Sequence, residues 1–200
     1  MLKRNELKNF QKIAMTVDVD KIHQIYMNNI GVIGNKRDHI NKACGTPYMP
    51  ENGYIQIPVT EFENQNYVFK NKSSGDTPEG DERNYRKLPD WVKGSYIEEV
   101  LDKFKSPYTR TRFCVINPGG YILPHIDYNT NYSVRYQIPI TTNDWCYVGV
   151  QRKNEKPEIR HLEPDGSVWF MNQGWNHSAW NMGKTDRIHM IVCVNGQEDL

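Results

Sequence analysis

The sequence predicts a mainly β fold with flanking helices, in which the strands build a double-stranded β-helix, or jelly roll. From residue 110 onward, short apolar or alternating segments follow one another. Turn sequences separate them, such as Asn-Pro-Gly-Gly at 117–120 and Pro-Asp-Gly at 164–166. The 200 residues also include five Trp and twelve Tyr, residue types that favour sheets over helix bundles. About eight short strands with such turns between them are typical of a jelly roll.

The alternating segments of the C-terminal half define the expected strands. Successive side chains of a strand point to opposite faces, so a half-buried strand has an apolar residue at every second position. On this basis, strands are expected near 111–116, 121–126, 132–140, 145–151, 157–163, 167–172, 177–181 and 187–194.

The first residues of the chain predict a strand followed by a helix. The segment 10–17 is short and largely apolar, which is typical of a strand. Asp18 or Asp20 can then accept a backbone hydrogen bond at the beginning of a helix. Ile22 and Tyr26 recur in that helix at helical spacing, so we expect one of its faces to pack against the core.

A further strand and a further helix are expected before the C-terminal strands begin. The segment 54–60 alternates like a half-buried strand, and Pro58 places it at a sheet edge because proline cannot donate to the ladder. A helix is expected over 90–105, where apolar side chains recur at every fourth position, at Val92, Tyr96, Val100 and Phe104.

The length and these elements indicate one domain of residues 1–200. Within it, we expect 1–107 to supply supporting helices and strands and 108–196 to form the jelly-roll core. Residues 34–51 are polar and interrupted by Gly and Pro, which predicts a loop. Residues 71–86 have the composition of a mobile surface loop, although a long loop of this kind is also a candidate lid over a site.

The composition indicates a soluble cytoplasmic protein without a nucleic-acid or membrane partner. The formal net charge is only +1, no apolar run approaches the length of a membrane span, and the first residues lack the apolar segment of a signal peptide. The cysteines form no CxxC pair, which favours buried reduced thiols over a disulfide framework or a zinc site. They are Cys44, Cys114, Cys146 and Cys193.

Three residues of the C-terminal half are the strongest functional signal. His125 and Asp127 lie two positions apart near a strand end, so their side chains share a face of the sheet. His177 follows several strands later, and we expect it to reach the same end of the barrel from the opposite sheet. Two imidazoles and one carboxylate occupy one face of a metal ion and leave the other positions open, as in non-haem Fe(II) oxygenases.

Arg187 lies on the last expected strand and extends this pattern. A guanidinium buried in a barrel needs a carboxylate, and Arg binds one in two-point geometry. The set of His125, Asp127, His177 and Arg187 resembles the Fe(II)/2-oxoglutarate-dependent dioxygenases. Residues 131–140 and 187–192 resemble strands of the aspartyl/asparaginyl β-hydroxylase-like branch, to which bacterial proline hydroxylases are similar. The resemblance covers roughly 108–196.

The resemblance implies a role for each residue of this motif. His125, Asp127 and His177 would ligate Fe(II), and Arg187 would bind the C5 carboxylate of the cosubstrate 2-oxoglutarate. Arg135 and Gln137 would lie beside the cosubstrate, although the branch often has His at the position of Gln137. O2 is the further reactant, and ascorbate a possible stimulant of turnover.

Each of these residues also has a purely structural interpretation. His189 shares a face with Arg187 and either lines the site or is a structural histidine, and no role is assigned to His161. The structural alternatives are a surface pair for His125 and Asp127, a core histidine for His177, a salt bridge to Asp186 or Glu158 for Arg187, and a solvated strand residue for Arg135.

The expected function is hydroxylation of an amino acid, or of an Asp, Asn or Pro residue in a peptide, with release of succinate and CO2. The partner is therefore a small-molecule or peptide substrate. Two alternatives remain: a cupin-like module that binds a metal or small molecule without catalysis, and a Zn(II)-dependent hydrolase or isomerase on the same barrel. The substrate, desaturation in place of hydroxylation, and the oligomeric state stay open.

Overall fold

The computed structural model describes residues 1–34, 53–63 and 81–200. Its helical segments are α1 (Val19–Gly34), the 3-10 turn η3 (Glu82–Asn84) and α3 (Tyr96–Asp102). Its strands are β1 (Phe10–Thr16), β2 (Tyr54–Pro58), β3 (Arg112–Ile116), β4 (Tyr121–His125), β5 (Val134–Thr141), β6 (Cys146–Gln151), β7 (Glu158–Arg160), β8 (Ser167–Met171), β9 (Asn176–Asn181) and β10 (Arg187–Val194).

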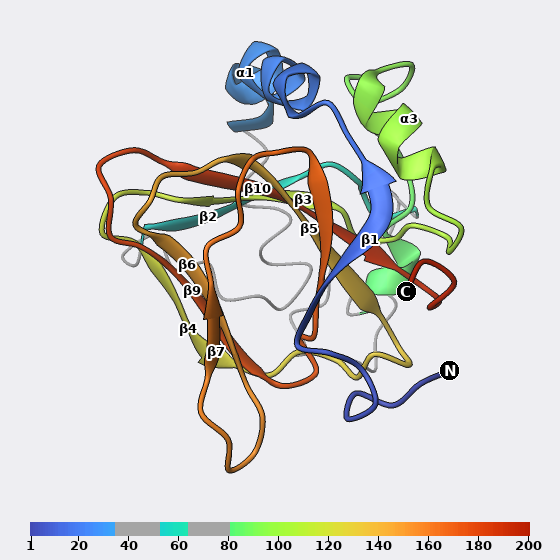
Figure 1. Cartoon of the computed structure of the whole chain (residues 1–200). Coiled ribbons are helices and arrows are strands. Elements are labelled where there is room, and N and C mark those ends of the chain that lie inside the picture. The colour runs from blue at the N-terminus through green and yellow to red at the C-terminus, as the bar shows by residue number, and fades with distance from the viewer. Residues whose placement is uncertain (35–52, 64–80) are drawn as a thin grey trace.

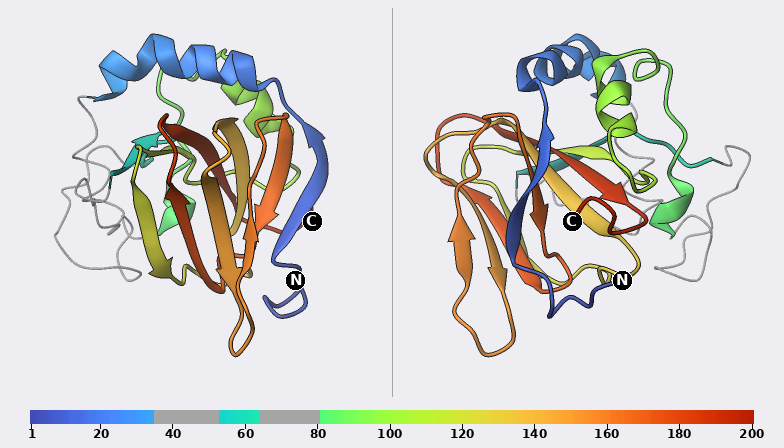
Figure 2. Two further views of the ribbon diagram at one scale, coloured as in Figure 1. Left: turned by 60° about the vertical axis from the view of Figure 1, so that its left-hand side comes forward. Right: turned by 45° about the vertical axis from the view of Figure 1, so that its right-hand side comes forward.

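The strands form two antiparallel sheets that face each other, as a jelly roll requires (Figure 1). The larger sheet has the order β1-β8-β5-β10-β3-β2, and the smaller sheet has the order β4-β9-β6-β7. Helices α1 and α3 lie side by side over the outer face of the larger sheet (Figure 2). The predicted fold class is therefore confirmed.

Alternation along the strands divides the apolar side chains into two cores. On β3, Phe113 and Val115 point to the helices, whereas Cys114 and Ile116 point into the space between the sheets. Every residue of β10 is buried, because this central strand is covered by the helices on one face and by the smaller sheet on the other. The space between the sheets is the one that contains the site described below.

The expected strands of the C-terminal half all occur, with ends that shift by up to a few residues. β2 is the edge strand of the larger sheet, as Pro58 predicted, but it ends at Pro58 instead of continuing to residue 60. The reason is a local irregularity in which the N–H groups of Val59 and Thr60 both donate to the carbonyl of Thr111. Two donors on one acceptor cannot continue a regular ladder.

The two helices differ in how well the sequence predicted them. α1 begins as expected, with the Asp18 carboxylate accepting a hydrogen bond from the N–H of Lys21 at 3.1 Å. The helix expected over 90–105 is wrong in its first part, because α3 begins only at Tyr96. Gly94 has a left-handed backbone (φ 69°), and Ser95 then caps the helix by accepting from the N–H of Ile97 at 3.2 Å.

Some predictions fall on parts of the chain outside the described residues. The loop expected at 34–51 lies there apart from Gly34, which is the last residue of α1. Of the loop expected at 71–86, only residues 81–86 are described. Among the described residues, Cys114, Cys146 and Cys193 are buried free thiols, as expected. No helix in the described part of the chain has the length and apolar character needed to span a membrane.

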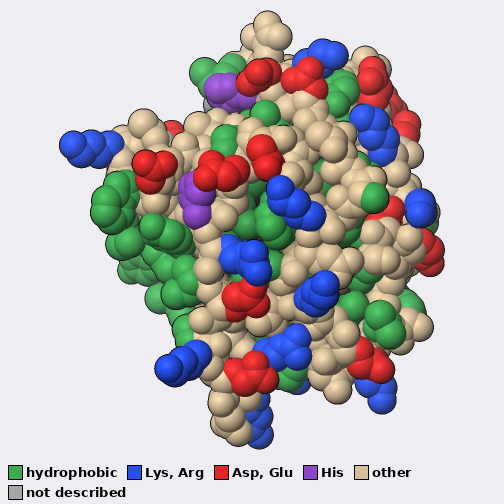
Figure 3. Space-filling model, viewed as in Figure 1, with side chains coloured by type: hydrophobic (Ala, Val, Ile, Leu, Met, Phe, Trp, Pro, Cys, Tyr) green, Lys and Arg blue, Asp and Glu red, His purple; other side chains and the backbone are tan. Residues whose placement is uncertain are grey.

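The outer face of the smaller sheet is apolar and exposed. Trp180 of β9 pairs in register with Tyr121 of β4 on one side and with Tyr147 of β6 on the other. Trp145 and Met182 are 59% and 60% exposed. Figure 3 shows hydrophobic side chains gathered on the side of the molecule that this sheet forms. The polar residues described next therefore lie on the opposite, inner face of the same sheet.

The turn before β8 depends on a glycine. Gly166 has φ +81°, and a Cβ there would come within 2.4 Å of the carbonyl oxygen of Val17. We expect Gly166→Ala to lower the free energy of unfolding by about 2–4 kcal/mol, the sum of a left-handed backbone cost and an overpacking cost. Gly119→Ala is the matched control, because Gly119 has φ +77° but open space around it. Urea denaturation should show a loss of only about 1–2 kcal/mol for the control, and equal losses would contradict the steric argument.

Candidate metal centre

Two neighbouring strands of the smaller sheet bring the three predicted ligands together. β4 pairs antiparallel with β9, and His125 lies directly opposite His177 in the register. Asp127 follows β4 by two residues, with its N–H donating to the carbonyl of Gln173 at 3.0 Å. The prediction that His177 comes from the opposite sheet is wrong, because β9 is the direct neighbour of β4.

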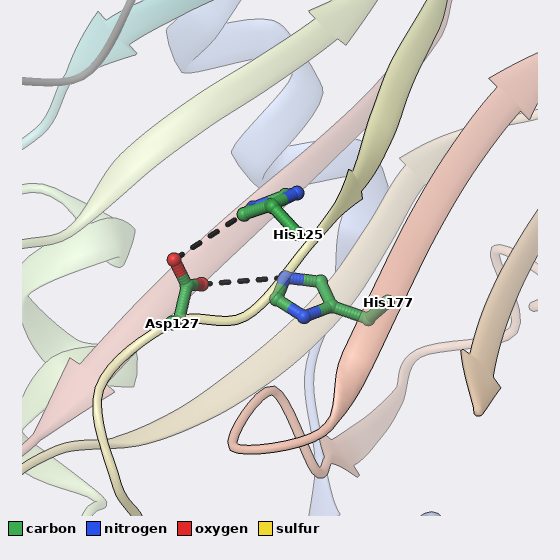
Figure 4. A group of neighbouring side chains, drawn as sticks. All are labelled: His125, Asp127 and His177. Atoms are coloured by element: carbon green, nitrogen blue, oxygen red, sulfur yellow. Dashed lines mark ion pairs between the residues drawn. The ribbon is translucent and has the colours of Figure 1, made fainter. Parts of the chain in front are cut away.

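The three side chains converge on one point, as Figure 4 shows. One ligand atom from each of His125, Asp127 and His177 lies within 4.8 Å of the others. The Asp127 oxygens lie 3.7 Å from the Nε2 of His125 and 3.3 Å from the Nε2 of His177. Two imidazole nitrogens and one carboxylate are a donor set that suits Fe(II) and other divalent transition metals.

Backbone carbonyls hold both imidazole rings in the form that a metal needs. The Nδ1 of His125 lies 2.7 Å from the carbonyl of Leu123, and the Nδ1 of His177 lies 3.0 Å from the carbonyl of Trp175. A carbonyl only accepts, so each Nδ1 carries the hydrogen and each Nε2 presents its lone pair to the centre. Burial, and then the neighbouring His177, lower the pKa of His125, which favours its neutral form.

Arg135 of β5 orients the carboxylate. Its Nη1 makes an ion pair with the Oδ2 of Asp127, and its Nη2 lies 2.5 Å from the Oε1 of Glu82. Burial alone would raise the pKa of Asp127, but Arg135 and then the two histidines outweigh it and hold that pKa well below its usual range. Arg135 is only 6% exposed, so its interpretation as a solvated strand residue is wrong.

Glu82 continues this ion pair into a buried network. Its side chain is 3% exposed and accepts hydrogen bonds from Arg135 and, at 2.8 Å, from the Nη1 of Arg110. The Nη2 of Arg110 donates to Gln56 of β2 at 2.8 Å. The two guanidinium groups overcome the effect of burial and lower the pKa of Glu82 to about 2. Glu82 is therefore an ionised anchor between two arginines.

No pattern in the sequence indicates this network. Glu82 falls in the segment 71–86, expected to be a mobile surface loop or a lid, whereas the turn η3 inserts its side chain into the space between the sheets. A charged residue in a polar segment has no periodic pattern around it, so no local signal distinguishes it from a solvated one. Arg110 was missed for the same reason.

Arg187 lies on the inner face of β10 without a carboxylate partner. It is 2% exposed, and among the described residues no carboxylate oxygen lies within ion-pair distance of it. Its Nη2 donates to the Nδ1 of His189 at 2.8 Å. The proposed salt bridges are wrong, because Asp186 bonds instead to Asn117 and Glu158 to Arg160. Burial lowers the pKa of Arg187 to about 10, so the group stays charged at neutral pH.

His189 and Gln137 surround this guanidinium. Gln137 lies 3.2 Å from the Nδ1 of His189, and both side chains are almost fully buried. A guanidinium can only donate, so the Nδ1 of His189 accepts from it and the ring is neutral. Burial and then Arg187 lower the pKa of His189 accordingly. His161 is instead placed between the carbonyl of Cys146 and Glu163, and it does not line the cavity.

One cavity of about 560 Å³ connects the three candidate ligands with Arg187. This volume is typical of a small-molecule site. Its charged lining comprises Asp127, Glu82 and the arginines Arg110, Arg112, Arg135 and Arg187. Its apolar lining includes Tyr54, Cys114, Val148, Met171 and Ile191.

The fold is found in solved structures with little sequence identity to this chain. AviO1 from Streptomyces viridochromogenes is similar with a TM-score of 0.50 and 12% identity, over 98% of this chain and 94% of that chain. An oxidoreductase of the 2OG-Fe(II) oxygenase family from Burkholderia pseudomallei is similar with a TM-score of 0.47 and 11% identity, over 88% of this chain and 90% of that chain.

The family is given by the sequence. Residues 62–196 match the model of the aspartyl/asparaginyl beta-hydroxylase family. The match covers more than half of the chain, which therefore belongs to this family. The resemblance found in the motif is confirmed, and it extends further toward the N-terminus than the expected region, which began near residue 108. The match thus includes η3, the turn that carries Glu82.

We expect the buried network around Glu82 to stabilise the folded protein. Glu82→Gln should lower the free energy of unfolding of the metal-free protein by about 3–5 kcal/mol near neutral pH, because two buried arginines lose their shared carboxylate. The folded pKa of Glu82 is about 2, below the usual 4.5, so its contribution is complete above pH 4.5 and is lost as the pH falls toward 2. The difference between variant and wild type should shrink over that range in urea denaturation.

Asp165→Asn provides the control for this measurement. Asp165 makes a half-exposed ion pair with Lys12 at 3.1 Å, and such pairs contribute only about 0–1 kcal/mol. A loss at Glu82 no larger than the loss at Asp165 would show that the buried network does not stabilise the fold.

Proposed function

We propose that this protein is a non-haem Fe(II)- and 2-oxoglutarate-dependent dioxygenase. In this proposal it hydroxylates an amino acid, or an Asp, Asn or Pro residue in a peptide, and releases succinate and CO2. The observation that carries the proposal is the combination in one cavity of His125, Asp127 and His177 with the guanidinium of Arg187, which has no carboxylate partner among the described residues. The first set suits a divalent metal, and the second suits the distal carboxylate of a 2-oxo diacid.

The donor set fits Fe(II) in three respects. Each Nδ1 donates to a backbone carbonyl, which leaves each Nε2 with a lone pair 3.7 Å (His125) and 3.3 Å (His177) from an oxygen of Asp127, where a shared metal ion would lie. Asp127 stays ionised under the influence of Arg135. Three ligands on one side leave positions open for a cosubstrate and O2. Bound Fe(II) would supply O2 activation coupled to oxidative decarboxylation of 2-oxoglutarate.

The surroundings of Arg187 fit 2-oxoglutarate. A buried cation without an anion costs free energy, which a bound carboxylate would recover. His189 holds the guanidinium from one side, leaving its other donors for the ligand. The C1 end of the cosubstrate would then face the candidate metal ligands. Arg135 and Gln137 line the same cavity, although both nitrogens Nη1 and Nη2 of Arg135 already hold carboxylates.

The cavity wall would keep water from the reaction. Cys114, Met171 and Ile191 lie on the larger sheet and Val148 on the smaller one, so apolar side chains from both sheets form part of the cavity wall. A dry cavity protects a reactive intermediate and strengthens the charge interactions inside it. In this proposal no side chain has to act as a general base, and the protein contributes fixed ligands and an oriented cosubstrate.

The central test is 2-oxoglutarate-dependent succinate release in air, with Fe(II) and ascorbate, against free amino acids and peptides. We expect succinate from the wild type and none from Asp127→Asn, because the amide is a poor metal ligand. The variant should also bind Mn(II), as a stable substitute for Fe(II), about 100-fold more weakly in calorimetry. A wild type that binds the metal but forms no succinate would favour a cupin-like binding module or a Zn(II)-dependent hydrolase.

The role of Arg187 as the cosubstrate anchor can be tested separately. Arg187→Gln should raise KM for 2-oxoglutarate about 10- to 100-fold, because a charge-assisted two-point contact is worth about 1.5–3 kcal/mol. Mn(II) affinity should stay at the wild-type value. Arg160→Gln is the control, since Arg160 of β7 lies 2.7 Å from Glu158 on a half-exposed strand and does not line the cavity. An unchanged KM in Arg187→Gln would exclude Arg187 as the anchor.

A further inference from the structure

The cavity contains a second buried arginine without a carboxylate. Arg112 of β3 is 6% exposed, and its Nη1 contacts only the Sγ of Cys193 at 3.3 Å and the carbonyl of Arg110 at 3.5 Å. In the described part of the chain, its Nε is buried without a hydrogen-bond partner. The carboxylate of Glu82 is held by Arg110 and Arg135. Arg112 therefore has no ion pair of its own among the described residues. Glu82 is near enough to interact with its charge but is shared with two other arginines.

The free donors of Arg112 lie on one edge of the guanidinium. Its protein contacts all involve Nη1, which leaves Nε and Nη2 without a bond among the described residues. Nε is covered by protein atoms, whereas Nη2 is not among the fully buried atoms. Nη2 is therefore the donor that a charged acceptor in the cavity can reach, and a charge-assisted hydrogen bond to a carboxylate would satisfy it.

Arg112 and Arg187 contact different residues of β10. The guanidinium of Arg112 contacts Cys193, which is the register partner of Arg135, and Arg135 bonds to Asp127. Arg187 instead contacts His189, four positions earlier on β10. Both guanidinium groups nevertheless have Cys114 and Tyr54 as near neighbours. They are two candidate anion-binding groups in one cavity, and the turnover experiment below tests whether they hold different carboxylates.

The exposed side of the cavity is formed by β4 and the residue after it. Tyr121, Leu123 and Ile126 are 41%, 49% and 59% exposed, whereas Arg112 and Arg187 on the larger sheet are 6% and 2% exposed. A cosubstrate anchored at Arg187 therefore lies on the buried side. The space between Arg112 and the candidate ligands remains for a second molecule that enters afterwards.

The charges of the cavity favour a negatively charged group in that space. Its described lining has four arginines against the two carboxylates of Asp127 and Glu82. A divalent metal and the dianion 2-oxoglutarate cancel each other, so the excess of positive charge persists when both are bound. An uncompensated cation in a low-dielectric cavity is costly. The remaining reactant is the substrate.

We propose that Arg112 binds a carboxylate of the substrate, and that the substrate is a small carboxylic acid such as a free amino acid. The acid group binds Nη2 of Arg112, and the rest of the substrate lies in the cavity that His125, Asp127 and His177 also line. This inference rests on the proposed function for the reaction, but the anion site itself does not depend on it. The cavity volume of about 560 Å³ accommodates a small acid together with the cosubstrate.

The first experiment measures binding to the metal-free protein, without turnover. The probes are L-proline, L-leucine and L-aspartate, each paired with its α-carboxamide, at constant ionic strength, with the rise in Tm as readout. We expect the acids to bind wild type and Arg187→Gln at least about tenfold more tightly than the carboxamides. Arg112→Gln should lose this preference. Equal binding of acid and carboxamide, or a preference that survives in Arg112→Gln, would overturn the proposal.

The second experiment measures turnover and separates the two sites. For the acid that most stimulates succinate release, Arg112→Gln should raise its KM at least tenfold more than it raises KM for 2-oxoglutarate. The opposite ratio would make Arg112 a cosubstrate anchor and overturn the inference. If wild type forms no succinate but Arg112→Gln still abolishes acid binding, the proposed function fails and the anion site stands.

The thermal stability of a further variant tests whether Arg112 has a structural role. An arginine that stabilises the fold through its charge would leave a less stable protein when replaced, whereas a buried charge without a partner does not stabilise. We therefore expect Arg112→Met to have a Tm equal to or above that of the wild type without ligands. A clear fall in Tm would assign Arg112 a structural role and contradict the proposal.

Discussion

The site depends on one buried chain of ion pairs, which runs from Asp127 through Arg135 and Glu82 to Arg110. Charges inside a protein are tolerated only when they are paired and hydrogen-bonded, so each member of the chain requires the next one. These ion pairs connect Asp127, which follows β4, with β5, with the turn η3 and with the segment before β3. They therefore hold the candidate metal carboxylate in place and also hold η3 against the barrel.

The arginines that line the cavity are of two kinds, those with a carboxylate partner and those without one. Arg110 and Arg135 have carboxylate partners and belong to the framework, whereas Arg112 and Arg187 have none among the described residues. A protein keeps an uncompensated buried cation at a cost in stability. Such a cost is common where a ligand supplies the missing charge, and both cations line the same cavity.

Much of the fold was predictable because the period of a strand is short and its signal is local. The expected strands of the C-terminal half occur close to their predicted ends, and Pro58 correctly indicated an edge. The helix expected from residue 90 was too long, because an apolar stripe continues through Gly94 while the backbone there turns left-handed. The pairing of β4 with β9 was also not predictable, since side-chain alternation defines the faces of a strand and not its neighbours.

The sequence by itself indicated His125, Asp127 and His177 as candidate metal ligands and Arg187 as a candidate anion-binding residue beside them, because these residue types at this spacing are chemically distinctive. Only the tertiary structure decided the importance of Glu82, Arg110 and Arg112. The meaning of a charged residue depends on whether it is buried and on what lies across from it. Both properties arise from the packing of distant segments, which no local pattern in the chain records.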